Sequence, residues 1–238
     1  MIANAIGIAS KNYNVLFFDG NSSGLLNSLI LTWPKILNLD ITFLSTRLTA
    51  IILLSFIITF SYKISKYFLN SSLSFLLSFP LILFFSFTKD PDFLHYSSEL
   101  FSTLLLIISY WIFIKYKKED KFFYIIPLLL SLIFFSKIQF GPVAFIFFII
   151  ILFEQYHLNK FNKNLIFLIL SFISIPTIFL FSHYLNNTLV DFFINNIQYP
   201  KDYVTIMNSS DINEISTDSK NNLSIFSQNK YLSHLMYN

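Results

Sequence analysis

Long apolar runs separated by short polar segments dominate the pattern along this chain. Six of these runs approach the roughly 20 apolar residues that a helix needs to cross a bilayer. Most are slightly short, but flanking tyrosine, tryptophan and lysine residues can extend them to the lipid headgroups. The pattern predicts an all-α protein, a polytopic transmembrane helical bundle of about six spans. The runs are residues 44–60, 73–88, 100–114, 122–136, 140–153 and 165–181.

The fourth and fifth runs are separated only by residues 137–139, so one bent helix is the alternative to a pair of helices. The lysine distribution favours the pair. Segments 61–72, 115–121 and 154–164 contain eight of the sixteen basic residues, and with six spans all three lie on one side. The positive-inside rule makes that side cytoplasmic. With five spans, the last segment would face the opposite side.

The acidic residues gather on the other side of this topology. We therefore expect the face that carries the candidate chemistry to be extracytoplasmic, in a bacterial inner (plasma) membrane. Ten of the thirteen acidic residues lie there: Asp19, Asp40, Asp90, Asp92, Glu99, Asp191, Asp202, Asp211, Glu214 and Asp218.

This topology puts both ends of the chain outside, although no cleavable signal peptide opens the sequence. A preceding helix with a cytoplasmic N-terminus would resolve the difficulty, so we expect the chain to be a fragment that lacks its first helix. We divide it into an extracytoplasmic segment (1–43), a transmembrane helical domain (44–181) and a polar extracytoplasmic tail (182–238), which we expect to be truncated.

Residues 22–39 form a shorter segment in which the apolar positions recur at helical spacing. This pattern indicates an amphipathic helix, which we expect to lie on the outer leaflet. Trp33 and Lys35 suit the level of the headgroups, and Pro34 would bend or divide the helix. Gly20 and Gly24 are expected to ease the turn that precedes it.

Composition agrees with a membrane protein and excludes some other classes. Hydrophobic residues make up 55% of the chain and charged residues 12%, whereas soluble domains average about 25% charged residues. A net charge of +3 gives no indication of a nucleic-acid partner. The absence of cysteine leaves no basis for a disulfide framework or for thiolate chemistry.

Two acidic regions are candidates for chemistry. Asp19 immediately precedes the amphipathic segment, where it is either a functional carboxylate or a helix cap. The loop 89–99 concentrates three carboxylates, a histidine and a lysine between apolar helices, a costly arrangement that we interpret as functional. Asp90 and Asp92 could share a divalent metal ion. His95 and Glu99 would lie on one helical face.

Cationic and amide groups form the third set of candidates. Lys137 lies at membrane depth between two predicted helices, with Gln139 beside it. Lys137 either extends to the headgroups or faces a phosphate from the lipid side. Arg47, at the outer end of the first span, either meets a phosphate or anchors its helix.

The order of these features resembles the N-terminal part of the GT-C superfamily of membrane glycosyltransferases. That group includes the dolichyl-phosphate-mannose protein mannosyltransferases and the bacterial aminoarabinose transferase of lipid A. The resemblance covers most of residues 17–145 and lies in the stretches FFDGNSSGLLNSLILTWPKILNLDITFLSTRLTAIIL, DPDFLHYSSEL and SKIQFGPVAF.

The resemblance implies sugar transfer from a polyprenyl-phosphate donor to a cell-envelope acceptor on the extracytoplasmic side, with inversion. On this analogy Asp19 is the acid of the first outer loop, commonly the catalytic base. Asp90 and Asp92 correspond to the acidic motif of the second outer loop, which binds metal in some members. Arg47, His95, Glu99, Lys137 and Gln139 are then expected to bind substrate, and membrane lipids are the other expected partner.

Three other functions are alternatives to sugar transfer. A transporter or lipid flippase would place ionisable residues or glycine and proline breaks near the middle of several helices, where this chain is almost free of charge. A nonenzymatic membrane scaffold would make no use of the acidic residues. An O-antigen polymerase or ligase would need arginines in a large late outer loop, a region that this chain does not contain.

Overall fold

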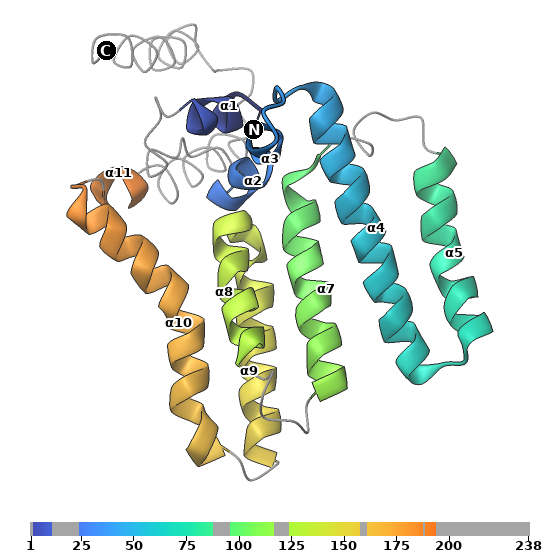
Figure 1. Ribbon diagram of the computed structural model, residues 1–238. Coiled ribbons are helices and arrows are strands. Elements are labelled where there is room, and N and C mark those ends of the chain that lie inside the picture. Colours follow the sequence, from blue (N-terminus) through green and yellow to red (C-terminus); the bar gives the residue numbers. More distant parts are fainter. Residues whose placement is uncertain are drawn as a thin grey trace, which may run out of the picture. The chain divides into compact units, whose positions relative to one another are not determined.

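The computed structural model describes residues 2–10, 24–87, 96–116, 124–157, 161–187 and 189–193. These residues contain helices and no strand, which confirms the all-α prediction (Figure 1). The long helices are α4 (Phe43–Phe68), α5 (Ser71–Phe87), α7 (Ser98–Tyr116), α8 (Ile125–Ser136), α9 (Gly141–His157) and α10 (Phe161–Leu185). The short ones are α1 (Ile2–Ala9), α2 (Leu25–Ile30), α3 (Trp33–Ile36), the 3₁₀ turn η1 (Ile138–Phe140) and α11 (Leu189–Phe193).

The long helices lie side by side, with successive helices running in opposite directions (Figure 1). α4 packs between α5 and α7, α7 packs on α8, and α10 packs against both α8 and α9. The short helices α1 to α3 lie at the end where α4 and α7 begin and α8 stops (Figure 1). This end, which we call the polar end, therefore gathers residues that are far apart in the sequence.

Each of the six apolar runs corresponds to one helix of the structure. Three helical stretches are both long and apolar enough to cross a membrane, namely Phe43–Phe68, Ser98–Tyr116 and Leu165–Leu185. The apolar helices α5, α8 and α9 are shorter. With 12 residues, α8 is about 18 Å long, against a hydrocarbon core of about 30 Å.

The fourth and fifth runs form two helices, as the lysine distribution predicts. α8 ends at Ser136 because Lys137 adopts an extended backbone, with φ −154° and ψ 112°. The turn η1 follows, and α9 then packs back against α8. The alternative of one bent helix across residues 137–139 is wrong.

The expected helix over residues 22–39 is divided in two. α2 ends at Ile30, and α3 begins with Pro34 in its first turn, where a missing backbone N–H costs nothing. The Trp33 indole nitrogen donates a hydrogen bond of 2.8 Å to Thr49 Oγ1 of α4, which fixes α3 on the bundle. On the neighbouring short helix, the polar side chains of Asn27 and Ser28 are buried against the protein.

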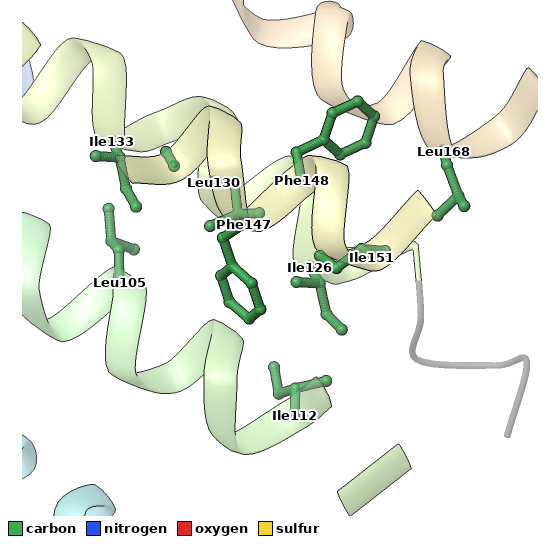
Figure 2. Close-up of a cluster of buried hydrophobic side chains, with 10 residues drawn as sticks. Leu105, Ile112, Ile126, Leu130, Ile133, Phe147, Phe148, Ile151 and Leu168 are labelled. Carbon is green, nitrogen blue, oxygen red and sulfur yellow. The ribbon is translucent and has the colours of Figure 1, made fainter. Parts of the chain in front are cut away.

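One hydrophobic cluster joins α7, α8, α9 and α10 (Figure 2). Fully buried Leu130 of α8 belongs to this cluster, together with side chains of α7 and α9. Phe148 of α9 stacks face to face on Phe172 of α10, with ring centroids 4.2 Å apart. A second cluster joins α1, α4 and α7 near the polar end, and includes Leu31 and Tyr96.

The exposed surface of the long helices is more apolar than that of a soluble protein. Large apolar residues are exposed along α4, α5, α9 and α10, whereas serine and threonine side chains are buried where helices meet. On α5, for example, Ser74 and Ser78 are buried while Phe75 and Phe79 are exposed. Small polar residues at helix contacts with apolar residues outside are typical of helices packed in lipid.

Truncation of a buried leucine should be far more costly than truncation of an exposed one. Leu130→Ala removes a fully buried side chain from the α7–α10 cluster, and we expect a loss of about 2–5 kcal/mol in the free energy of unfolding. The matched variant Leu170→Ala changes a side chain that is 59% exposed, so its loss should stay below about 0.5 kcal/mol. Denaturant titration of the purified protein in detergent, followed by circular dichroism, measures both. Equal losses would contradict the described core.

Candidate functional site

The side-chain amide of Asn27 connects three helices at the polar end. Its nitrogen Nδ2 donates to the carbonyl oxygen of Ser136, at the end of α8, over 2.6 Å. The same nitrogen donates to the carbonyl oxygen of Ser98, at the start of α7, over 3.2 Å. The amide oxygen Oδ1 accepts a hydrogen bond of 2.7 Å from the Tyr96 hydroxyl. A buried side chain thus uses both amide hydrogens and its oxygen.

Gly24 brings the backbone of the chain directly onto the end of α8. Its N–H donates to the carbonyl oxygen of Ser136 over 2.8 Å. A Cβ atom here would lie 2.1 Å from the carbonyl oxygen of Phe135, a contact that no side chain can make. With φ −55°, the backbone conformation itself does not require glycine. The residue is therefore needed for this close approach, and not for the turn that the sequence suggests.

Tyr96 is held as a hydrogen-bond donor within this site. Its side chain is buried, and burial raises the pKa of the phenol well above its ordinary value. The hydroxyl therefore stays protonated under all physiological conditions. Beside it, Ser102 Oγ of α7 donates to Ser136 Oγ of α8 over 2.8 Å, which adds a second connection between the two helices.

Lys137 and Glu99 form an ion pair next to this network. The Lys137 ammonium donates to Glu99 Oε1, joining the start of η1 to the first turn of α7. The Lys137 side chain is only 9% exposed and the Glu99 side chain is 57% exposed. Ser97 Oγ donates to the other carboxylate oxygen over 3.2 Å. Lys137 does not extend to the surroundings, because its ammonium is directed at this carboxylate.

The structure brings together two of the residues singled out in the sequence. Glu99 and Lys137 contact each other, whereas Arg47 and Gln139 are exposed, and no hydrogen bond joins either to that pair within the described residues. The other candidates, Asp19, Asp90, Asp92 and His95, lie outside the described residues, so the shared face expected for His95 and Glu99 is not tested.

Several residues of the site escape sequence reasoning. Asn27 reads as one polar position of an amphipathic helix, and Ser136 as the polar edge of an apolar run. Two partners of Asn27, Tyr96 and Ser136, lie 69 and 109 residues away from it in the chain. The one local signal is that Asn27 lies among leucines at helical spacing. An asparagine buried on such a face is costly unless its amide is hydrogen-bonded, so its presence there indicates a partner.

The ion pair determines what this site can do chemically. An ammonium group has three N–H donors, and one is directed at Glu99, so the group can also contact a phosphate or another anion. Within the described segments, no group of three or more histidine, cysteine, aspartate or glutamate side chains could hold a metal ion. The divalent metal expected at Asp90 and Asp92 concerns residues outside those segments.

Comparison with known proteins does not place this chain in a family. No protein-family model, no curated protein and no solved structure matches it.

Replacement of Asn27 should destabilise the polar end. In Asn27→Leu, the buried Tyr96 hydroxyl loses its acceptor and two carbonyl groups lose a donor, so we expect a loss of about 1–3 kcal/mol in the free energy of unfolding. The control Asn186→Leu removes an exposed amide with one local hydrogen bond, to Ser182, and should cost below about 0.5 kcal/mol. Denaturant titration in detergent compares the two. A loss no larger than the control's would refute the connecting role.

Proposed function

We propose that this chain is a multi-pass protein of a bacterial plasma membrane that transfers a sugar from a polyprenyl-phosphate donor to a cell-envelope acceptor. Its six long helices cross the bilayer, and its lysine-rich end is cytoplasmic. α2 and α3 lie at the level of the outer headgroups. The polar end then faces the extracytoplasmic side, where the lipid-linked donor is used.

The exposed apolar surface of the long helices supports the membrane placement. Phenylalanine, leucine and isoleucine side chains are exposed along four long helices, and they would be poorly solvated in water. Buried serine side chains in the long helices hydrogen-bond to backbone carbonyls one turn earlier, as Ser78 does to the carbonyl oxygen of Ser74. Both features favour lipid as the surrounding solvent.

The short helix α8 is compatible with a full crossing. Ile126, Leu130 and Ile133 are fully buried, so α7, α9 and α10 separate much of α8 from the surroundings. Hydrophobic mismatch acts on a surface that meets lipid, and α8 offers little of that surface. Tyr124, just before α8, can meet the headgroups at the cytoplasmic end.

The observation that carries the proposed chemistry is the Lys137–Glu99 pair. It places a buried cation at the end of an apolar bundle, next to a carboxylate that remains more than half exposed. A phosphate that approaches Lys137 from the lipid can use the donors that Glu99 leaves free. The pair thus provides one contact for the phosphate that leaves during sugar transfer.

The proposed reaction uses a carboxylate as base. Asp19 takes the proton of an acceptor hydroxyl, and the hydroxyl oxygen attacks the anomeric carbon of the donor sugar. The bond from that carbon to the phosphate oxygen breaks, and the lipid phosphate leaves with the electron pair. The Lys137 ammonium stabilises the negative charge on the departing phosphate. Inversion at the anomeric carbon follows from this single displacement.

Charge placement favours an enzyme of the membrane surface over a transporter. In the six long helices, every lysine, arginine, aspartate and glutamate lies within about two turns of a helix end. A transporter or flippase would need ionisable groups near the middle of its helices. The serine side chains of the interior are instead used in hydrogen bonds between or within helices.

Cysteine labelling tests whether the short helix α9 crosses the membrane. The chain has no cysteine, so Gln139→Cys and His157→Cys each introduce a single thiol, at opposite ends of the α8–α9 hairpin. In intact cells, we expect a membrane-impermeant maleimide to label the thiol at position 139 and to reach position 157 only after permeabilisation. Labelling of both positions from outside would overturn the six-span topology.

Two substitutions test the reaction. In membranes that contain the full chain, Asp19→Asn and Lys137→Met should each reduce transfer from radiolabelled polyprenyl-phosphate sugars by about 100-fold or more. The control Lys35→Met removes an exposed lysine that pairs with Asp40, and it should leave transfer unchanged. Undiminished transfer by Asp19→Asn would refute its role as the base. If the unmodified chain transfers no sugar from a panel of such donors, the proposed activity is wrong.

A further inference from the structure

Two lysines from neighbouring helices converge on one tryptophan at the end opposite to the candidate site. Lys63, near the end of α4, places Nζ 5.4 Å from the centre of the Trp111 ring of α7. Lys115, one turn after Trp111, places Nζ 4.9 Å from the same ring. Since both distances end at one ring centre, the two nitrogens lie within about 10 Å of each other.

Further aromatic rings hold these lysines in place. Lys63 Nζ is also 4.9 Å from the Phe60 ring, and Lys115 Nζ is 4.8 Å from the Tyr116 ring. The rings contact one another edge to face: Phe60 and Trp111 at 5.3 Å, and Trp111 and Tyr116 at 6.2 Å. Each lysine thus contacts two rings, which reduces the side-chain freedom that binding an anion would otherwise cost.

The positive charges of this cluster are not neutralised by its contacts. Rings attract an ammonium group but carry no net charge. Within the described residues, no carboxylate forms an ion pair with Lys63 or Lys115, and both side chains are exposed. The sequence adds to this excess, because segments 61–72, 115–121 and 154–164 hold eight lysines and three acidic residues.

An apolar surface continues from the cluster toward the middle of α4. Phe56, one turn before Phe60, is 49% exposed, and Ile52 is exposed one turn earlier. A molecule that meets the ammonium groups with an anionic head can therefore place a hydrocarbon chain along this face. The side chains on α4 change from apolar to cationic within about two turns, as the parts of a phospholipid do.

We propose that Lys63, Trp111 and Lys115 form a binding site for the headgroup of an anionic phospholipid of the cytoplasmic leaflet. The phosphate lies between the two ammonium groups, and the acyl chain runs along Phe56 and Ile52. This site rests on the membrane placement proposed above and is independent of sugar transfer. Charge complementarity selects an anionic lipid over a zwitterionic one, whose own cation would meet the two lysines.

The position of Trp111 allows a direct test. The chain has two tryptophans, so Trp33→Phe leaves Trp111 as the sole indole fluorophore, inside the proposed site. The full chain with this change is reconstituted into phosphatidylcholine vesicles that contain a small fraction of acyl-brominated phosphatidylglycerol, and quenching of Trp111 is measured. Matched vesicles contain the same fraction of acyl-brominated phosphatidylcholine.

We expect the brominated anionic lipid to quench Trp111 at a lower fraction than the brominated zwitterionic lipid. Lys63→Met and Lys115→Met should each weaken the preference by about fivefold. The control Lys66→Met removes an exposed lysine of α4 that, within the described residues, has no cation–π contact with these rings, and it should keep the preference. Lys63→Arg should retain most of the preference for the anionic lipid, because a guanidinium group is also cationic and also contacts aromatic faces.

The other outcomes separate the two proposals. Equal quenching by both brominated lipids would leave the membrane placement standing and overturn the lipid site. Absence of quenching by either lipid would overturn both. Loss of the preference on addition of inorganic phosphate, with sodium chloride of equal ionic strength as the control, would show that the cluster binds free phosphate. That result would also overturn the lipid site.

Discussion

The polar end depends on the carbonyl group with which α8 stops. The last carbonyl groups of any helix lack partners within the helix, and leaving one unpaired among apolar side chains is costly. The Ser136 carbonyl oxygen finds two donors, the Gly24 N–H and the Asn27 amide. The position of α2, the absence of a side chain at Gly24 and the Tyr96–Asn27 bond all follow from this requirement.

The same ending of α8 also sets the position of Lys137. The extended backbone of Lys137 breaks the helix and turns the side chain toward Glu99 on α7. At the preceding residue, Ser136, the carbonyl oxygen accepts hydrogen bonds from Gly24 and Asn27. The Ser136 hydroxyl accepts another from the hydroxyl of Ser102. The lysine therefore projects from a fixed support, as a group must if it is to meet a phosphate in a defined position.

Much of the helical framework could be predicted from the sequence, because each apolar run carries its own signal. The runs match six helices, and the lysines correctly distinguish a hairpin from one bent helix at Lys137. Pro34 correctly predicts the division between α2 and α3. These signals are local, and they predict the structure well because the described residues are almost entirely helical.

The site was harder to predict because its contacts are not local. Glu99 and Lys137 both stand out as charges beside apolar runs, yet their pairing over 38 residues leaves no trace in either neighbourhood. Gly24 reads as a turn residue, whereas its purpose depends on the carbonyl oxygen of Phe135. Asn27 has the same difficulty, since its partners belong to α7 and α8.

The bond between Asn27 and Ser136 also has a consequence for biosynthesis. The two residues are 109 positions apart, and a ribosome adds about 5–20 residues per second, so the acceptor is made roughly 5–20 s after the donor. During that interval α2 has been synthesised but lacks the helix end that it later covers. The segment that contains Asn27 thus reaches its final contacts late, and its buried amide needs water or another temporary partner until α8 is made.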